Sequence, residues 1–133
     1  MKNTGKTRHA TYIINYHMVW IPKYRREILT GEVAEEVESI LQNIAIKNEW
    51  EIISLSVQPD HVHIFVSVPP KIAPADVVKI LKGASARYLL SKYPHLGIKS
   101  KRGSLWAPSY YIGTAGNISS NTIRKYIDEC QDH

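Results

Sequence analysis

The sequence predicts an α+β fold built around one antiparallel sheet. Four segments have the residue pattern of strands, most clearly residues 50–58 and 61–68, which alternate apolar and polar residues, and two segments between the strands carry apolar residues at the spacing of an amphipathic helix. The segments follow one another in the order β-α-β-β-α-β, which is the ferredoxin-like or RRM-like arrangement, and an additional helix ends the chain. The 133 residues suffice for a hydrophobic core, so we expect residues 1–133 to form a single domain.

Residues 11–21 are predicted to form the first strand, after a basic stretch at residues 1–9 for which we expect a flexible tail. Apolar residues occur at both parities of this segment, which predicts burial on both faces and therefore a central strand. His17 interrupts the apolar pattern. It is interpreted either as part of a polar working face or as a structural histidine whose hydrogen bonds are satisfied.

A basic turn follows this strand. Lys23, Tyr24, Arg25 and Arg26 place three cations and an aromatic ring at the end of the strand. Cations bind the phosphates of a nucleic-acid strand and an aromatic ring stacks on its bases, so these four residues are candidates for DNA binding. A solvated turn is the other interpretation.

Residues 32–48 are predicted to form an amphipathic helix, because apolar residues recur at helical spacing: Val33, Val37, Ile40, Leu41 and Ile44. Glutamates crowd its first turn, where the helix dipole favours negative charge. We therefore expect this helix to be structural and to face away from any polyanion.

Residues 50–58 and 61–68 are predicted to form an antiparallel hairpin, joined by the short turn at Pro59 and Asp60. In the first of these strands the apolar parity is Ile53, Leu55 and Val57. The small polar residues of the other parity, Ser54, Ser56 and Gln58, are then expected to lie near the histidines of the second strand.

The strand at residues 61–68 has an apolar parity of Val62, Ile64, Val66 and Val68 and a polar parity that begins with His61 and His63. The two histidines lie about 7 Å apart at the Cα level, which lets both imidazoles reach one cation. A polar strand face without a metal is the alternative. Two histidines also leave a metal short of ligands, since even a tetrahedral site takes four.

Residues 76–92 are predicted to form the second helix, with Pro74 in the position that the first turn tolerates. Its apolar stripe is expected at Val77, Ile80, Leu81, Ala84 and Tyr88. Lys79, Lys82 and Arg87 lie off that stripe and are candidates for DNA binding. Gly83 costs roughly 1 kcal/mol relative to alanine in mid-helix, so we expect another group to approach closely there.

The rest of the chain is predicted to form a basic loop, a strand and a helix. Lys101 and Arg102 in the loop at residues 94–103 are further candidates for DNA binding. Residues 104–112 are expected to form an edge strand, since Pro108 cannot lie in a central one. The last helix is expected at residues 118–131, where Tyr126 belongs to the apolar stripe and is, on composition alone, a packing residue.

Charge and cysteine content limit the class of protein. The net charge is +5, with seven acidic residues in residues 31–60, six Lys or Arg in residues 1–30 and eight in residues 61–103. This pattern favours one basic face that binds phosphate, with a solubilising surface as the alternative. The single cysteine excludes an intramolecular disulfide and indicates a reducing compartment. Because no apolar run reaches membrane-spanning length, we expect a cytoplasmic protein with no membrane association.

Five segments in the same order resemble the single-tyrosine HUH transposases (TnpA-type) of small bacterial and archaeal insertion sequences. They are residues 16–25, the His-hydrophobic-His motif at 61–63 preceded by Pro59 and Asp60, residues 81–85, residues 105–110 and residues 122–126. The resemblance covers nearly the whole chain.

This resemblance implies that Tyr126 is the nucleophile and that His61 and His63 hold Mg²⁺ or Mn²⁺. It implies cleavage of single-stranded DNA at transposon ends, leaving a 5′-phosphotyrosine and a free 3′-OH, and binding of imperfect hairpins near those ends. It also implies a homodimer, in which the tyrosine helix can act on the histidine pair of the partner.

One position departs from the family pattern. The family usually has a glutamine four residues after the tyrosine, but here that residue is Cys130, whose thiol suits a hard ion poorly. Gln131 lies about 140° around the helix from Tyr126, and Glu129 about 60°. We expect Gln131 to reach the metal through a frayed helix end, with Glu129 as the alternative third ligand.

Two other functions fit the same fold. A non-catalytic module that binds single-stranded nucleic acid would need the basic face and the aromatic residues but neither Tyr126 nor the histidines. A metal-dependent RNA or DNA hydrolase would use water as the nucleophile, and Tyr126 would only pack.

Overall fold

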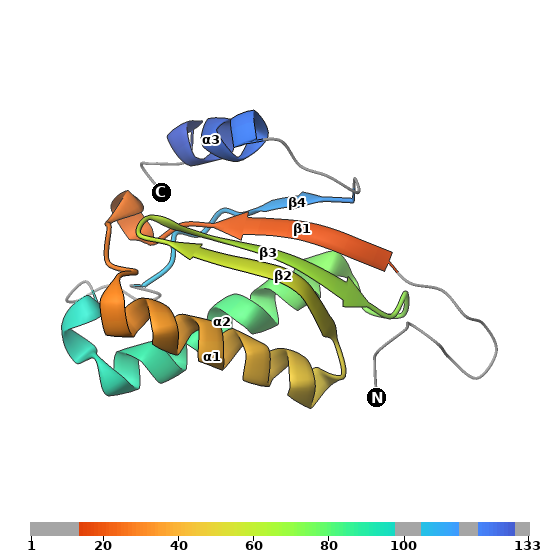
Figure 1. Cartoon of the computed structure of the whole chain (residues 1–133), viewed down its shortest axis with the longest axis horizontal. Helices are drawn as coiled ribbons and strands as arrows, with labels where there is room; N and C mark the ends of the chain where they lie inside the picture. Colours follow the sequence, from red (N-terminus) through yellow and green to blue (C-terminus); the bar gives the residue numbers. More distant parts are fainter. Residues whose placement is uncertain (1–13, 98–104, 115–119, 130–133) are drawn as a thin grey trace.

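The computed structural model describes residues 14–97, 105–114 and 120–129. Within these residues the elements are, in chain order, β1 (Ile14–Trp20), the 3-10 helix η1 (Lys23–Arg25), α1 (Gly31–Asn48), β2 (Glu51–Gln58), β3 (His61–Val68), α2 (Pro74–Lys92), the 3-10 helix η2 (Pro94–Leu96), β4 (Tyr111–Gly113) and α3 (Ser120–Glu129) (Figure 1). This order confirms the predicted β-α-β-β-α-β arrangement with an additional C-terminal helix. The expected tail at residues 1–9 lies outside the described residues.

The four strands form one sheet in the order β2-β3-β1-β4. Each neighbouring pair is antiparallel: β2 with β3, β3 with β1, and β1 with β4. This is the ferredoxin-like strand order, and β1 is a central strand as predicted. β3, which carries the histidine pair, is the other central strand.

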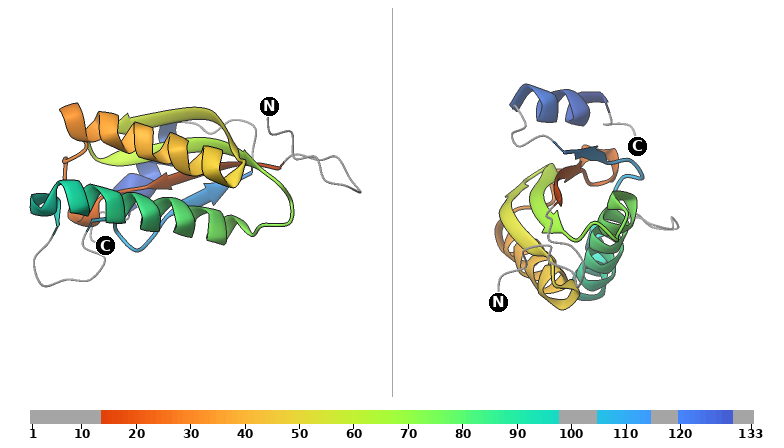
Figure 2. Two further views of the ribbon diagram at one scale, coloured as in Figure 1. Left: turned by 90° about the horizontal axis from the view of Figure 1, so that it is seen from below. Right: turned by 90° about the vertical axis from the view of Figure 1, so that its right-hand side faces the viewer.

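The helices cover the two faces of the sheet unequally: α1 and α2 lie against one face, and α3 lies over the other (Figures 1 and 2). The main core fills the space between the sheet and the first two helices. The apolar parity of β3 points into it, since Val62, Ile64, Val66 and Val68 are fully buried. His61 and His63 therefore belong to the opposite face, on the same side of the sheet as α3.

A small second cluster anchors α3 outside the main core. Ile127 is buried against Ile21 and Ala107, and Ile123 and Tyr126 pack partly buried around them. The predicted apolar stripe of the last helix is thus confirmed for the residues that the structure describes. Cys130 lies outside them.

In β2 the prediction for Ile53 is wrong. The pairing register with β3 shifts between Ile52 and Ser54, which is the signature of a β-bulge. The bulge moves Ile52 to the core side, where it packs with Leu55 and Val57, and leaves Ile53 48% exposed. The apolar pattern alone cannot distinguish Ile52 from Ile53.

The stripe and the glycine of α2 also differ from the expectation. The buried residues are Val77, Val78, Leu81, Ser85 and Leu89, whereas Ile80 and Tyr88 are 37% and 60% exposed. Ser85 tolerates burial because its hydroxyl donates to a backbone carbonyl of the preceding turn and accepts from Trp106 Nε1 (3.1 Å). The close approach expected at Gly83 is absent from the described structure, since a Cβ there would meet nothing within 4 Å.

The last strand is shorter than the predicted 104–112 and is interrupted near Pro108. Tyr111 pairs with Val19, and Trp106 forms an isolated bridge with Pro22. Val19 and Pro22 are three residues apart, whereas their partners Tyr111 and Trp106 are five apart. The last segment therefore has two more residues than β1 over this stretch, and it bulges at 108–110. Proline lacks the N–H that a continuous ladder would need.

Candidate active site

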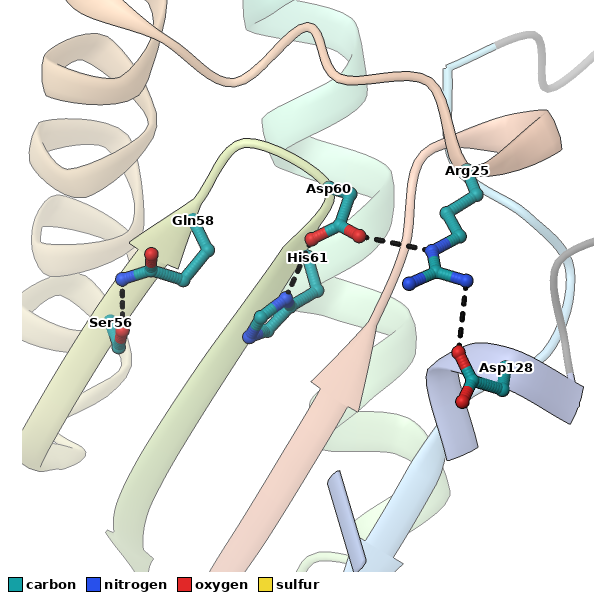
Figure 3. A network of polar contacts seen from close by, with 6 residues as sticks. All are labelled: Arg25, Ser56, Gln58, Asp60, His61 and Asp128. Carbon is teal, nitrogen blue, oxygen red and sulfur yellow. Dashed lines mark hydrogen bonds and ion pairs between the residues drawn. The ribbon is translucent and has the colours of Figure 1, made fainter. Parts of the chain in front are cut away.

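His61 and His63 lie side by side on the sheet face that α3 overhangs. Across the hairpin they pair with Gln58 and Ser56 of β2, as predicted. Gln58 Nε2 donates a hydrogen bond to Ser56 Oγ (2.9 Å), so these two side chains bond to each other on the strand next to the histidines (Figure 3).

A carboxylate orients His61. Asp60 Oδ1 lies 3.0 Å from His61 Nδ1 (Figure 3). Burial would raise the pKa of Asp60, but hydrogen bonds from His61 and Arg25 outweigh it and hold that pKa below its usual value. Because an ionised carboxylate only accepts, His61 Nδ1 carries the proton and Nε2 is left as the nitrogen that can bind a cation.

His63 is half-buried and has a histidine neighbour. Its Nε2 lies 2.9 Å from Nδ1 of His17, whose ring stacks on Phe65 with centroids 4.0 Å apart. Burial, and then the charges of His17 and His61, lower the pKa of His63 from 6.5 to about 4. His63 is therefore neutral near pH 7, which is the form that ligates a metal. His17 lies on the same face and is also buried with its Nδ1 within bonding distance of His63, so the structure is compatible with both interpretations of this residue.

The histidine pair stays a predicted cation site, because His63 Nε2 is engaged with His17 Nδ1 (2.9 Å) and no third ligand is assembled in the described residues. No group of three His, Cys, Asp or Glu side chains that could hold a metal occurs within residues 14–97, 105–114 and 120–129. Glu129 is thus not joined to the pair in this arrangement. Gln131 lies outside the described residues.

Tyr126 is held on α3 above the same sheet face. Its Oη lies 3.4 Å from Ser109 Oγ, and its ring lies 6.4 Å from the ring of Tyr111. The ring also packs against the small cluster around Ile127. The ring of Tyr126 therefore packs against apolar residues, while its hydroxyl lies beside the hydroxyl of Ser109.

Two arginines of the basic turn bond to other parts of the protein, unlike the side chains of a solvated turn. Tyr24 and Arg25 both have positive φ angles, 61° and 55°. Arg25 Nε donates to Asp60 Oδ2 and Nη1 to Asp128 Oδ1, each at 3.0 Å (Figure 3). Arg26 donates to the carbonyl oxygens of Lys23 and Leu96, at 3.2 and 2.8 Å. Tyr24 stays 52% exposed.

Helix α2, which carries Lys79, Lys82 and Arg87, lies on the opposite side of the sheet from α3 (Figure 1). Lys79 and Arg87 are exposed there. Lys82 instead donates to the carbonyl oxygens of Ala107 (2.6 Å) and Ser109 (3.2 Å), at the bulge of the last strand. The predicted DNA-binding residues of the described structure are thus divided between two faces, and Lys101 and Arg102 lie outside it.

Beside Lys82, α2 and residues 106–110 line a mainly apolar groove of about 330 Å³. Gly83 belongs to this lining, which explains why a side chain there would meet open space.

Two residues of the site were missed by the sequence interpretation. Asp60 was assigned to a turn and Asp128 was given no role, yet both bind Arg25. The adjacency of Asp60 to His61 is a signal that could have identified the first. Asp128 is 103 residues from Arg25, and no local pattern connects them.

Among the described helices, none combines the length and the apolar character needed to cross a membrane.

Comparison with known proteins places this arrangement among transposases. Residues 10–130 match the model of the family described as "Transposase IS200 like". The ISDra2 transposase TnpA of Deinococcus radiodurans is 45% identical over 127 residues, which cover 96% of this chain and 91% of that protein. The transposase of insertion sequence element IS200 from Salmonella typhimurium is 31% identical over 119 residues, covering 90% of this chain and 78% of the relative.

Two solved structures share the fold. The crystal structure of a candidate transposase from Deinococcus radiodurans superposes with a TM-score of 0.86 at 40% identity and covers 95% of this chain and 96% of its own. A REP-associated tyrosine transposase, solved bound to a REP hairpin, superposes with a TM-score of 0.57 at 15% identity and covers 94% of this chain and 70% of its own.

Proposed function

This chain belongs to the family of IS200-like transposases, and we propose that it cleaves and rejoins single-stranded DNA at the ends of an insertion sequence through a covalent 5′-phosphotyrosine at Tyr126. The observation that carries this proposal is the meeting of two elements on one sheet face. β3 contributes the histidine pair, and α3, which bears the tyrosine, is tied to the start of β3 through Arg25.

In the proposed reaction Tyr126 Oη attacks the scissile phosphorus. The Oη–P bond forms, the bond from phosphorus to the 3′ oxygen breaks, and that oxygen takes a proton to become a 3′-OH while the phenolic proton goes to water. In rejoining, a 3′-OH attacks the same phosphorus and releases the tyrosine. The phosphodiester energy is kept in the covalent link, so no nucleotide cofactor is required.

A phenol with a pKa near 10 is a weak nucleophile near pH 7, so the reaction needs assistance. We propose that His61 Nε2 and His63 hold Mg²⁺ or Mn²⁺, with Gln131 or Glu129 as a third ligand. When bound, such an ion polarises the scissile phosphate and neutralises charge that develops on its oxygens. The bond between Asp60 and His61 and the neutral state of His63 support this assignment.

The proposed partners are single-stranded DNA with hairpins near the transposon ends and a second copy of the chain. One tyrosine makes one cut at a time and excision needs two, which supports a homodimer with one tyrosine from each subunit. For DNA contact, the ring of Tyr24 and the cations Lys79 and Arg87 are exposed candidates within the described residues, and Lys101 and Arg102 outside them stay candidates as well.

The covalent intermediate can be tested directly. The protein is mixed with Mg²⁺ or Mn²⁺ and single-stranded DNA from a matching element that is labelled at its 3′ end, and the products are resolved on a denaturing gel. We expect a labelled protein adduct that Tyr126→Phe abolishes and EDTA prevents. Cleavage that persists in Tyr126→Phe would instead identify a hydrolase, and hairpin binding without any cleavage would identify a non-catalytic binding module.

A further inference from the structure

Arg25 occupies a strained turn between two parts of the site. Tyr24 and Arg25 are consecutive residues with φ angles of 61° and 55°, a region that side chains other than glycine rarely adopt. Each such residue costs on the order of 1–3 kcal/mol, and the cost is tolerated where surrounding contacts impose the conformation. The turn aims the guanidinium of Arg25 at two carboxylates from distant parts of the chain (Figure 3).

These contacts form one chain, which we call the Arg25 network: Asp128, Arg25, Asp60 and His61. Its three links, Asp128 to Arg25, Arg25 to Asp60 and Asp60 to His61, are all 3.0 Å long. The side chains of Arg25, Asp60 and His61 are mostly shielded, at 16% to 23% exposed, whereas the Asp128 side chain on α3 is 55% exposed. The links nearest His61 are therefore the strongest, and the link to α3 is the one that solvent screens most.

The two ends of the network contact the two groups of the proposed chemistry: one end reaches the cation-binding His61, and the other lies on the helix that bears Tyr126. Asp60 fixes the proton of His61 on Nδ1, which leaves Nε2 for a cation. Asp128 is two residues after Tyr126, about 200° further around the helix. Holding Asp128 therefore sets the rotation of α3 and with it the direction in which Tyr126 points.

We propose that Arg25 is a positioning residue that couples the docking of the tyrosine helix to the orientation of His61. The inference deepens the proposed function, on which it rests for the roles of His61 and Tyr126. A docked α3 holds the guanidinium against Asp60, and a released α3 leaves Arg25 with one carboxylate in place of two. Coupling between two sites is reciprocal: if the docking of α3 raises the cation affinity of His61 by some factor, a bound cation strengthens the docking of α3 by the same factor.

The test changes Asp128, which bonds to Arg25 and is separated from His61 by two intermediate residues. Binding of Mn²⁺ to the DNA-free protein is measured by calorimetry, and the tautomer of His61 is read from its ¹⁵N chemical shifts at pH 8. In Asp128→Asn we expect Mn²⁺ affinity to fall about fivefold or more. We also expect a smaller fraction of His61 with the proton on Nδ1.

Glu38→Gln is the matched control. It removes one negative charge from an exposed position on α1, across the sheet from the histidines, and should leave both readings unchanged. Arg25→Lys keeps the charge but lacks the fork that serves two carboxylates, so it should reproduce the Asp128→Asn effect. Adding Asp128→Asn to Arg25→Lys should then cause little further loss, because the shared link is already broken.

Several outcomes would overturn the coupling. Asp128→Asn could match Glu38→Gln in Mn²⁺ affinity and in the His61 tautomer, or the two changes could add fully in the double variant. An Arg25→Lys protein that loses affinity only for single-stranded DNA would make Arg25 a phosphate contact instead. Wild-type protein that binds no Mn²⁺ would count against the proposed metal role, whereas the tautomer would still decide whether the network acts on His61.

Discussion

Lys82 shows how the contacts of a single residue alter the interpretation of its charge. By its position on α2 it was a candidate for DNA binding, but its ammonium group ends against the carbonyl oxygens of Ala107 and Ser109. These carbonyls are exposed by the bulge at residues 108–110 and need donors, because Pro108 interrupts the ladder with β1. Lys82 thus secures the segment that faces Tyr126, and its role in DNA binding stays a prediction.

The burial of Lys82 predicts a specific pH dependence. Burial lowers its pKa from 10.5 to about 8. Between these values the unfolded chain binds a proton that the folded chain has released, so this group makes the free energy of unfolding rise with pH across that window. Below pH 8 both states are protonated, and the folded state carries the full cost of the buried charge.

Lys82→Met removes the titration while keeping most of the side-chain volume. Urea unfolding of both proteins is compared at pH 7 and pH 10. The stability of the wild type relative to the variant should be greater at pH 10 by about 1–2 kcal/mol, after allowance for partial exposure to solvent. A difference that stays constant between the two pH values would contradict the lowered pKa. Deprotonation of Lys82 leaves its two hydrogen bonds in place, because the neutral amine still has two N–H groups for the carbonyl oxygens of Ala107 and Ser109.

At the scale of elements, β4 and α2 contain glycines with opposite surroundings. A Cβ at Gly113 would lie 2.5 Å from the hydroxyl oxygen of Tyr111, and that ring neighbours Tyr126. At Gly83 a Cβ would meet nothing within 4 Å. The first glycine therefore makes room for a ring, and the second only costs helix stability.

Alanine substitution at these two glycines should shift stability in opposite directions. Gly113→Ala is expected to lower the free energy of unfolding by about 1–3 kcal/mol, because the Tyr111 ring must move. Gly83→Ala is expected to raise it by about 0.5–1 kcal/mol through helix propensity. Thermal and urea unfolding give both values. Equal shifts in the two variants would show that Tyr111 accommodates the methyl group without cost.

At the scale of the whole molecule, α3 is attached by a cluster that is separate from the main core. Ile127 is 2% exposed and packs against Ile21 and Ala107, whereas Leu81 belongs to the main core beneath the sheet. Regions with few buried contacts open at a lower free energy than the global unfolding. We therefore expect the tyrosine helix to detach at a lower free energy than that needed to unfold the sheet and its two helices.

Ile127→Ala should release α3 without unfolding the domain. Loss of a buried isoleucine costs about 2–5 kcal/mol, which here falls mainly on the local docking of α3. We expect faster hydrogen exchange in residues 120–129, little change in the thermal midpoint and strong loss of the DNA adduct. Leu81→Ala is the control and should lower the thermal midpoint clearly. Cooperative loss of the whole fold in Ile127→Ala would contradict separate attachment.

Local patterns were sufficient for the elements that repeat with a regular period. The alternation at residues 61–68 predicted both the apolar face of β3 and the polar placement of His61 and His63, because a strand turns by half a revolution per residue. The same reasoning failed where two registers were equally apolar, as at Ile52 and Ile53, and along α2, where the predicted and the observed stripes share Val77 and Leu81. There the bulge and the packing of Ser85 against Trp106 decided which side chains are buried.

The shared strand face of His61 and His63 follows from spacing within one element, whereas the role predicted for Tyr126 rests on the resemblance to a family and not on its own pattern. The partners of Arg25 do not follow from the sequence, since Asp60 and Asp128 lie 35 and 103 residues away and meet it only when α3 folds over the sheet. The sequence alone does not distinguish an arginine or lysine that binds phosphate from one that binds a carboxylate. The role of such a residue depends on the nearest opposite charge, and only the folded chain brings that charge within bonding distance.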